Sequence, residues 1–287
     1  MKLLDGKSLS VDICQTLKRE IATLTRRSPA LAFILIGEDP ASQTYVRLKK
    51  KQCREVGIQS QTLLLPSNVS KQTLIDHIQT LNQDPMIDGI LVQQPLPKQI
   101  ATKTVFEAVD PAKDVDGFHP LNLGKLLMGQ SGGFIPCTPL GIIKLLEAYQ
   151  IPVEGRHAVI LGRSHIVGKP LAALLVQKEK NRNATVTLAH RFTRDLAALC
   201  RSADILIAAM GSPRFIKASM VKPGAVVVDV GINRVANSKG GYSLIGDVAF
   251  DEVATICSAI TPVPGGVGPM TIAMLLANTL TSYRNHC

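Results

Sequence analysis

Short apolar runs alternate with amphipathic stretches along most of this chain. Such runs occupy residues 31–37, 86–92, 157–161, 203–211 and 224–233, and the more polar segment 184–190 has the length of a further strand. A short apolar run between turn residues is typical of a parallel strand buried on both faces. The intervening pattern predicts helices over residues 9–26, 40–56, about 138–149 and 171–178, and a last apolar helix that ends near Tyr283.

This strand and helix alternation occurs twice, once before and once after residues 121–140. Parallel strands joined by helices are typical of the α/β class. The sequence therefore predicts two α/β domains that face one cleft, the second with a Rossmann-like, doubly wound parallel sheet.

The helix expected over residues 40–56 has a clear start and stop. Asp39 is placed to cap it, Pro40 to open it and Gly57 to end it. At about 100° per residue, one face contains Ala41, Tyr45, Leu48, Lys49, Gln52 and Val56, and the opposite face contains Arg47, Lys50, Lys51 and Arg54. A half-buried lysine on the first face can act as a general acid or base. Alternatively, Lys49 extends from the edge of that face into water.

A glycine-containing turn follows the apolar run 157–161 and precedes a helical stretch. It contains Gly162 and Gly168. Such a turn lets the backbone approach a phosphate, which the N–H groups at the start of the helix then bind. The strict G-x-G-x-x-G spacing is absent, so the turn alone fits either a dinucleotide loop or an ordinary turn.

The residues after segment 184–190 favour one dinucleotide over another. Enzymes that use NAD usually carry an acidic residue there, roughly 20 residues after the first glycine. Here the positions hold His190, Arg191 and Thr193, and Arg163 lies inside the turn. Two guanidinium groups could bind the 2′-phosphate of NADP, although both could also be solvated surface charges. The missing carboxylate and the added cations favour NADP.

Polar residues at other strand ends are further candidates for a site. Gln93 follows the run 86–92, at the end of a strand where ligands bind in α/β sheets. Asp114 and Asp116 precede Gly117, and we expect one of them to cap the turn and the other to accept hydrogen bonds from a ligand. The loop 260–271, rich in glycine and proline, either allows close approach of a flat ligand or simply links domains.

Composition narrows the class of partner. The 287 residues suffice for one large or two modest domains, with 46% hydrophobic and 4% aromatic residues. The 32 lysines and arginines exceed the 22 acidic residues and give a net charge of +10, which favours anionic partners such as nucleotides, nucleic acid or acidic metabolites. The basic residues are spread along the chain without an aromatic stacking platform, which argues against nucleic acid.

Cysteine spacing and hydropathy indicate the cellular compartment. The six cysteines form neither C-x-x-C pairs nor metal-ligand spacings, so we expect small buried apolar groups in a reducing cytosol and no metal site. The N-terminus lacks the apolar run of a signal peptide, and no apolar run approaches the about 20 residues of a membrane span. A soluble cytoplasmic protein is expected.

Taken together, five motifs resemble those of the bifunctional methylenetetrahydrofolate dehydrogenase/cyclohydrolase family. The resemblance runs from the first helix to the last, in order and in spacing. The motifs are Tyr45-x-x-x-Lys49, Val92-Gln93-x-Pro95-Leu96-Pro97, Lys113-Asp114-Val115-Asp116-Gly117, Gly162-Arg163-Ser164-x-Ile166-Val167-Gly168-x-Pro170, and Thr261 to Thr271 with sequence TPVPGGVGPMT.

The resemblance implies two reactions in one site. A hydride passes from 5,10-methylenetetrahydrofolate to NADP+, and water then converts the 5,10-methenyl cation to 10-formyltetrahydrofolate, a step of one-carbon metabolism that serves purine biosynthesis. By similarity, Lys49 is the catalytic lysine, Gln93 holds it, Tyr45 packs on the folate rings and Asp116 binds the amino edge of the pterin. Relatives are homodimers joined through the cofactor domain.

The resemblance also implies which residues bind each ligand. Residues 1–120 plus 268–287 would form the folate-binding catalytic domain, and residues 121–267 the NADP-binding domain. Substrate contacts would include Pro264 and Gly265. Cofactor contacts would come from Gly162, Arg163, Ser164, His190, Arg191 and Ile232.

Two positions depart from the family pattern, and two other functions stay open. Some relatives have serine at the position of Arg191, and many have a second aspartate at that of Ala249. A relative that has lost hydrolysis is possible within the enzyme class. A basic nucleotide- or RNA-binding module would also explain the charge of +10, and it would bind RNA in a strongly salt-dependent way.

Overall fold

The computed structural model describes residues 1–237 and 241–286 and divides into two compact units. Residues 1–10 and 138–271 form one, which we call the six-stranded unit. Residues 11–137 and 272–287 form the other, the three-stranded unit. The expected α/β class with parallel sheets is confirmed, whereas the ligand-based domain ranges remain a prediction.

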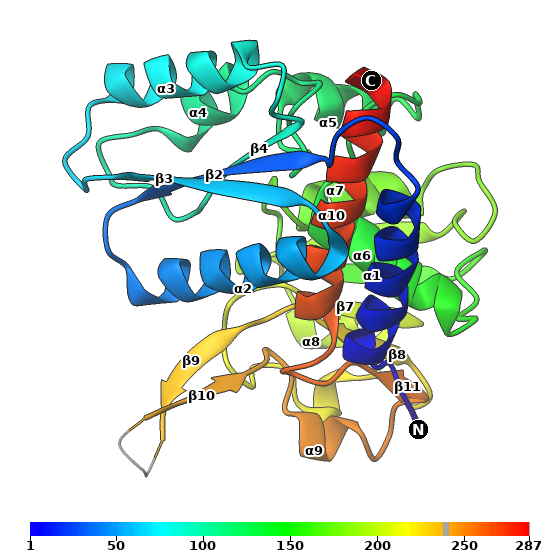
Figure 1. Ribbon diagram of the computed structural model, residues 1–287. Coiled ribbons are helices and arrows are strands. Elements are labelled where there is room, and N and C mark those ends of the chain that lie inside the picture. Colours follow the sequence, from blue (N-terminus) through cyan, green and yellow to red (C-terminus); the bar gives the residue numbers. More distant parts are fainter. Residues whose placement is uncertain (238–240, 287) are drawn as a thin grey trace. The chain divides into compact units, whose positions relative to one another are not determined.

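The three-stranded unit contains a parallel sheet in the order β3 (Gln59–Leu65), β2 (Ala30–Ile36) and β4 (Gly89–Val92). In Figure 1, α2 (Pro40–Val56) covers one face, and α3 (Lys71–Gln83) and α4 (Thr102–Ala108) cover the other. Alternate residues of β2 point to opposite faces, as the period of a strand requires. One set packs under α3 and α4, namely Ala30, Ala32, Ile34 and Ile36.

Helix α2 has the predicted start and stop. The Asp39 carboxylate accepts a hydrogen bond from the Ser42 N–H at 2.8 Å, and Gly57 ends the helix at a φ of 92°. The predicted solvent face is confirmed, since Arg47, Lys50, Lys51 and Arg54 are exposed.

The predicted inward face of α2 is wrong at one position. The Leu48 side chain is 47% exposed, because the helix packs on the sheet through a face rotated away from it. That buried face contains Ser42, Val46, Cys53 and Val56. Tyr45 and Lys49 lie at its edge and are half-buried.

Three further helices belong wholly or partly to this unit: α1 (Gly6–Ala22), α5 (Pro120–Leu127) and α10 (Val267–His286). The predicted helix 9–26 begins earlier, because the Asp5 carboxylate accepts a hydrogen bond from the Ser8 N–H at 3.0 Å and caps it. The last helix continues past Tyr283 to His286. The segment containing β3 and α3 was not predicted.

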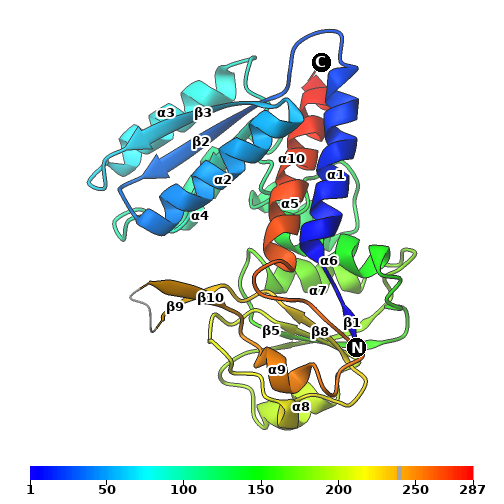
Figure 2. The same cartoon turned by 60° about the horizontal axis from the view of Figure 1, so that its bottom comes forward.

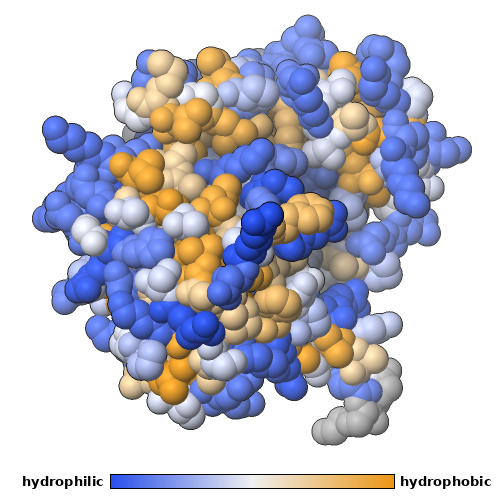
Figure 3. Space-filling model, turned by 180° about the vertical axis from the view of Figure 1, so that it is seen from behind, coloured by the Kyte–Doolittle hydropathy of each residue, from blue (hydrophilic) through white to orange (hydrophobic). Residues whose placement is uncertain are grey.

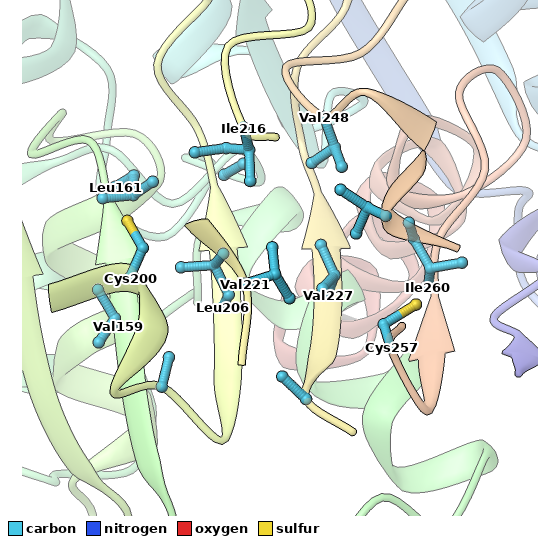
Figure 4. Packing of buried hydrophobic residues seen from close by; sticks show 14 of the residues in the cluster. Val159, Leu161, Cys200, Leu206, Ile216, Val221, Val227, Val248, Cys257 and Ile260 are labelled. Atoms are coloured by element: carbon cyan, nitrogen blue, oxygen red, sulfur yellow. The ribbon is translucent and has the colours of Figure 1, made fainter. Parts of the chain in front are cut away.

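The six-stranded unit has an all-parallel sheet in the order β1-β11-β8-β7-β5-β6. Figure 2 shows α6 and α7 on one face and α8 and α9 on the other. Figure 4 shows the apolar cluster under α8 and α9, which includes Val159, Leu206, Val227 and Ile260 from neighbouring strands. The strands are β1 (Lys2–Leu3), β5 (His157–Leu161), β6 (Thr185–Ala189), β7 (Ile205–Ala208), β8 (Val226–Asp229) and β11 (Ala259–Ile260); the helices are α6 (Cys137–Ala148), α7 (Gly168–Leu175), α8 (Leu196–Arg201), η1 (Ala218–Met220) and α9 (Phe250–Val253).

Several boundaries in this unit differ from the predictions. Helix α6 begins at Cys137, one residue before the predicted start, and the hydroxyl of Thr138 pairs with that of Thr271 at 3.0 Å. The runs 203–211 and 224–233 form shorter strands, because their ends turn into loops. An unpredicted antiparallel hairpin follows, β9 (Asn233–Ala236) with β10 (Tyr242–Ile245).

The last features of the fold are its mixed surface and its cysteine thiols. Figure 3 shows hydrophobic residues interspersed with hydrophilic ones on one face. Across residues 1–237 and 241–286, no helix combines the length and apolarity that a membrane span requires. The expected burial of the cysteines is confirmed for Cys53, Cys137, Cys200 and Cys257, whereas Cys14 is half-buried and Cys287 lies outside the described residues.

Candidate active site

The side chains of Lys49 and Gln93 meet in the three-stranded unit. The Lys49 amine on α2 donates to Oε1 of Gln93 at 3.1 Å. Gln93 follows β4 directly, and its backbone N–H still bonds to the Ile34 carbonyl of β2 at 2.9 Å. Its side-chain N–H donates to the Gln94 carbonyl at 2.7 Å, which orients the amide oxygen toward the lysine. Gln93 thus lies at the carboxyl end of a parallel strand, as expected.

Asp114 is the carboxylate that organises the turn before α5. It accepts hydrogen bonds from the backbone N–H groups of Phe118 at 3.1 Å and His119 at 2.7 Å, and from the Asn122 amide at 2.8 Å. Burial raises the pKa of Asp114 to about 7, although these hydrogen bonds oppose the rise. The expectation that one of the two aspartates would cap this turn is confirmed.

Asp116 lies close to Lys49 and has a different environment. Burial raises the pKa of Asp116, while the positive charge of Lys49 and a hydrogen bond with the Cys137 thiol lower it. Gly117 follows with a φ of 78°, and its Cα packs so tightly on residues 135–136 that a side chain would overlap their backbone. The lysine, the amide and this carboxylate therefore form one cluster.

Two residues around Asp116 were missed from the sequence. The Cys137 thiol donates to the Val115 carbonyl at 3.3 Å. The buried amide of Asn278 on α10 donates to the carbonyls of Val115 at 2.8 Å and Ile135 at 3.1 Å. Asn278 could have been noticed in the sequence as an amide within an apolar stretch of the last helix, because a buried amide needs partners.

In the six-stranded unit, the turn between β5 and α7 is as tight as its glycines predict. Gly162 has a φ of 122°, and a side chain at Gly168 would overlap the Gly162 carbonyl. The Ser164 hydroxyl accepts a hydrogen bond from the Val167 N–H at 3.1 Å, which secures the start of α7. Its own O–H remains available as a donor.

A cavity of about 510 Å³ adjoins this turn. Both predicted guanidinium groups line it. Within the described residues, neither is found in an ion pair with a carboxylate. The Arg191 guanidinium lies 4.7 Å from the ring centre of Phe192. The lining residues are Arg163, His190, Arg191, Leu196, Met210, Ser212 and Phe215. A cavity with two cations and apolar walls fits a phosphorylated nucleotide.

The remaining predicted residues lie on loops of the same unit. Ile232 is 42% exposed between β8 and β9. Gly265 has a φ of 112°, and its carbonyl accepts the Lys7 N–H at 2.7 Å. Pro264 precedes it. The structure therefore groups Tyr45, Lys49, Gln93 and Asp116 in one unit and the other predicted residues in the other unit.

Two family models match the chain. Residues 4–116 match the catalytic domain of the tetrahydrofolate dehydrogenase/cyclohydrolase family. Residues 136–287 match the NAD(P)-binding domain of the same family.

Full-length relatives show the same similarity. The chain is 55% identical over 290 residues to the bifunctional protein FolD of Chlorobium phaeobacteroides, covering 99% of this chain and 98% of that protein. The crystal structure of FolD from Campylobacter jejuni is similar with a TM-score of 0.95, at 49% identity and with 100% of both chains covered. FolD of Trypanosoma brucei, complexed with NADP cofactor and an inhibitor, gives 0.93 at 38% identity, covering 99% of this chain and 97% of that one.

Proposed function

This chain belongs to the tetrahydrofolate dehydrogenase/cyclohydrolase family, and we propose that Lys49 is the residue on which its hydrolytic chemistry depends. The enzyme is bifunctional. It oxidises 5,10-methylenetetrahydrofolate with NADP and hydrolyses the 5,10-methenyl product to 10-formyltetrahydrofolate. The observation that carries the residue assignment is the 3.1 Å hydrogen bond from the Lys49 amine to the oriented oxygen of Gln93.

In the oxidation, the protein has to position substrate without opposing the charge that develops. NADP+, when bound, accepts the hydride. The substrate becomes an amidinium cation, so no acid is needed, and a protonated amine beside the reacting carbon would raise the barrier. Lys49 therefore acts best as a neutral amine during this step, with its lone pair toward the new cation and one N–H held by Gln93.

In the hydrolysis, the same amine moves protons. Water adds to the methenyl carbon, one O–H proton passes to the Lys49 amine, and a C–O bond forms. The ammonium group then returns the proton to the ring nitrogen as its bond to that carbon breaks. The remaining O–H proton is released to water as the C=O bond forms, which leaves the formyl group on the other nitrogen. A positioned acid and base of this kind typically accelerates a reaction about 10²–10⁴-fold.

Asp116 and Tyr45 are proposed to hold the folate. Asp114 is already engaged by three donors of its own turn, so Asp116 is the carboxylate left to face a ligand. As a carboxylate beside Lys49, it keeps acceptor capacity for the amino edge of the pterin. Tyr45 lies one helical turn before Lys49 and offers a ring on which the folate rings can stack.

The cofactor is proposed to bind in the cavity of the six-stranded unit. Arg163 and Arg191 would pair with the 2′-phosphate, and His190 would lie beside it. Gly162 and Ser164 would contact the phosphates at the start of α7. Ile232, Pro264 and Gly265 would approach the reacting ends of the two ligands.

These assignments place folate binding in the three-stranded unit and NADP binding in the six-stranded unit, near the ranges expected from the sequence. We further propose a cytoplasmic homodimer joined through the cofactor domain that serves purine biosynthesis. The family resemblance supports the dimer, and sedimentation at several protein concentrations tests it.

Lys49→Met tests the central assignment. We expect methenyltetrahydrofolate hydrolysis to fall by about 10²-fold or more, because the proton carrier is lost. The matched control is Lys50→Met, which removes an exposed lysine from the next position of α2 and should leave hydrolysis at the parental rate. Circular dichroism and the thermal midpoint confirm folding. Parental hydrolysis by Lys49→Met would remove this lysine from the mechanism.

A further inference from the structure

Two buried carboxylates lie side by side in the six-stranded unit and take no part in the reactions above. Asp229 ends β8 and is 3% exposed, and Asp247, in the segment after β10, is 0% exposed. Across the described ranges, neither pairs with a lysine or arginine. A carboxylate withdrawn from water needs other donors in compensation, and here nearly all of them are backbone N–H groups.

Asp247 binds the loop that follows β7. Its two oxygens accept three consecutive backbone N–H groups, those of Met210 at 2.7 Å, Gly211 at 2.9 Å and Ser212 at 2.8 Å. The side-chain amide of Asn233, the first residue of β9, donates a fourth hydrogen bond at 2.9 Å. One carboxylate thus joins two loops at the carboxyl edge of the sheet.

Asp229 in turn binds the segment that carries Asp247. Its carboxylate accepts the backbone N–H groups of Asp247 and Val248, both at 2.9 Å, and that of Gly231 at 3.0 Å. Burial raises the pKa of Asp229 to about 6, and the hydrogen bonds oppose this rise. A side chain at Gly231 would overlap Asp247, and one at Gly246 would overlap Asp229, so the packing leaves no free space around the pair.

The loops held in this way form part of the cofactor cavity. Met210 and Ser212 line it together with Arg163 and Arg191. Asn233 directly follows Ile232, the other expected cofactor contact. Two of the three backbone N–H groups that Asp247 binds, those of Met210 and Ser212, therefore belong to residues that line the cavity.

We propose that Asp247, anchored by Asp229, is a positioning residue for NADP: it fixes the backbone of residues 210–212 in the shape that the cofactor needs. This inference rests on the proposed location of NADP in that cavity. Asp247→Asn keeps the volume but replaces one oxygen by an NH2 group, which would face backbone N–H donors. The loop must then shift, and the cavity wall shifts with it.

Asp204 supplies a matched control. It precedes β7, at the opposite end of that strand, and its carboxylate accepts the His157 N–H at 3.0 Å and the Lys222 amine at 2.7 Å. It is therefore another carboxylate that anchors backbone in the same unit, but away from the cavity. Asp204→Asn should reduce stability without changing the affinity for the cofactor.

The experiment is a fluorescence titration of the full-length enzyme with NADPH, supported by the KM values for NADP and for folate. We expect NADPH to bind about 10-fold more weakly to Asp247→Asn, which corresponds to a loss of about 1.4 kcal/mol of binding free energy. The KM for NADP should rise more than the KM for folate. Asn233→Ala removes a single hydrogen bond from Asp247 and should weaken NADPH binding in the same direction. It also keeps the inference testable if Asp247→Asn does not fold.

Parental NADPH affinity in Asn233→Ala and Asp247→Asn, or an equal weakening in Asp204→Asn, would overturn the positioning role. Arg191→Ala distinguishes this failure from a failure of the proposed site. If Arg191→Ala weakens NADPH binding and the Asp247 variant does not, only the positioning role is wrong. If Arg191→Ala also binds NADPH as tightly as the parent, the proposed location of the cofactor is wrong as well.

Discussion

At the scale of single residues, the two aspartates of the Lys113 to Gly117 motif show how environment divides similar side chains between roles. Asp114 accepts three hydrogen bonds from its own turn, whereas Asp116 faces Lys49. Local spacing did not say which aspartate caps the turn, because both precede the same glycine, and only the family resemblance assigned Asp116 to the ligand. Only the backbone path places the N–H groups of residues 118 and 119 at Asp114.

The shifted pKa of Asp114 predicts that the free energy of unfolding depends on pH. Burial raises its pKa to about 7 in the folded protein, so the folded state holds a proton that the unfolded chain releases near pH 4. This group therefore stabilises the fold most at low pH, and that contribution is lost as the pH rises from about 4 to about 7, at up to about 1.4 kcal/mol per pH unit.

Asp114→Asn removes this titration. We expect the free energy of unfolding of the parent, compared with that of Asp114→Asn, to fall as the pH is raised from 5 to 7. Only the parent has a carboxyl group at this position, and its stabilising protonation is lost over that range. Thermal midpoints of both proteins over that range measure the difference. A difference that stays constant with pH would show that Asp114 does not titrate there.

At the scale of elements, cap signals and apolar runs predicted α1, α2, α6, α7, α10 and the strands β2 and β4 to β8. Failures occurred where partners distant in sequence decide. Helix α2 begins and ends as Asp39, Pro40 and Gly57 indicate. Leu48 is exposed because of the way the helix is rotated about its axis on the sheet. A helical wheel drawn for one segment does not give that rotation. Asn278 and Asp247 act on segments more than 30 residues away, so local spacing gave no sign of their partners.

The turn between β5 and α7 offers a test at this scale. Gly168→Ala places a methyl group against the Gly162 carbonyl, and we expect a loss of about 1–3 kcal/mol together with weaker NADPH binding. Gly124→Ala in α5 is the matched control, because its methyl group would meet nothing within 4 Å. It should stabilise by about 0.4–1 kcal/mol. Equal effects of the two substitutions would contradict the close approach at the turn.

At the scale of the whole molecule, composition and charge indicated an α/β protein with an anionic ligand, and the five motifs identified the family. The two sheets and their parallel topology agree with that prediction. Contacts between individual side chains were harder to predict from the sequence. The 3.1 Å bond between Lys49 and Gln93 joins residues 44 positions apart, and helical periodicity alone slightly favoured a solvated role for Lys49.

A single folate site around Lys49 for both reactions makes a prediction about inhibition. An unreactive folate analogue should compete with methylenetetrahydrofolate in the dehydrogenase assay and with methenyltetrahydrofolate in the hydrolase assay, with the same inhibition constant. Steady-state kinetics on the parental enzyme measures both constants at one pH and salt concentration. Clearly different constants would indicate two separate folate sites.

The anchored amide of Gln93 limits how this enzyme can change during evolution. Glutamate has the same shape and lies one nucleotide substitution away in the genetic code. Yet a carboxylate there would face the Gln94 carbonyl, which now accepts an N–H, and would place a negative charge beside the Lys49 amine. Glutamate at this position would therefore disturb the cluster through its charge rather than through its size.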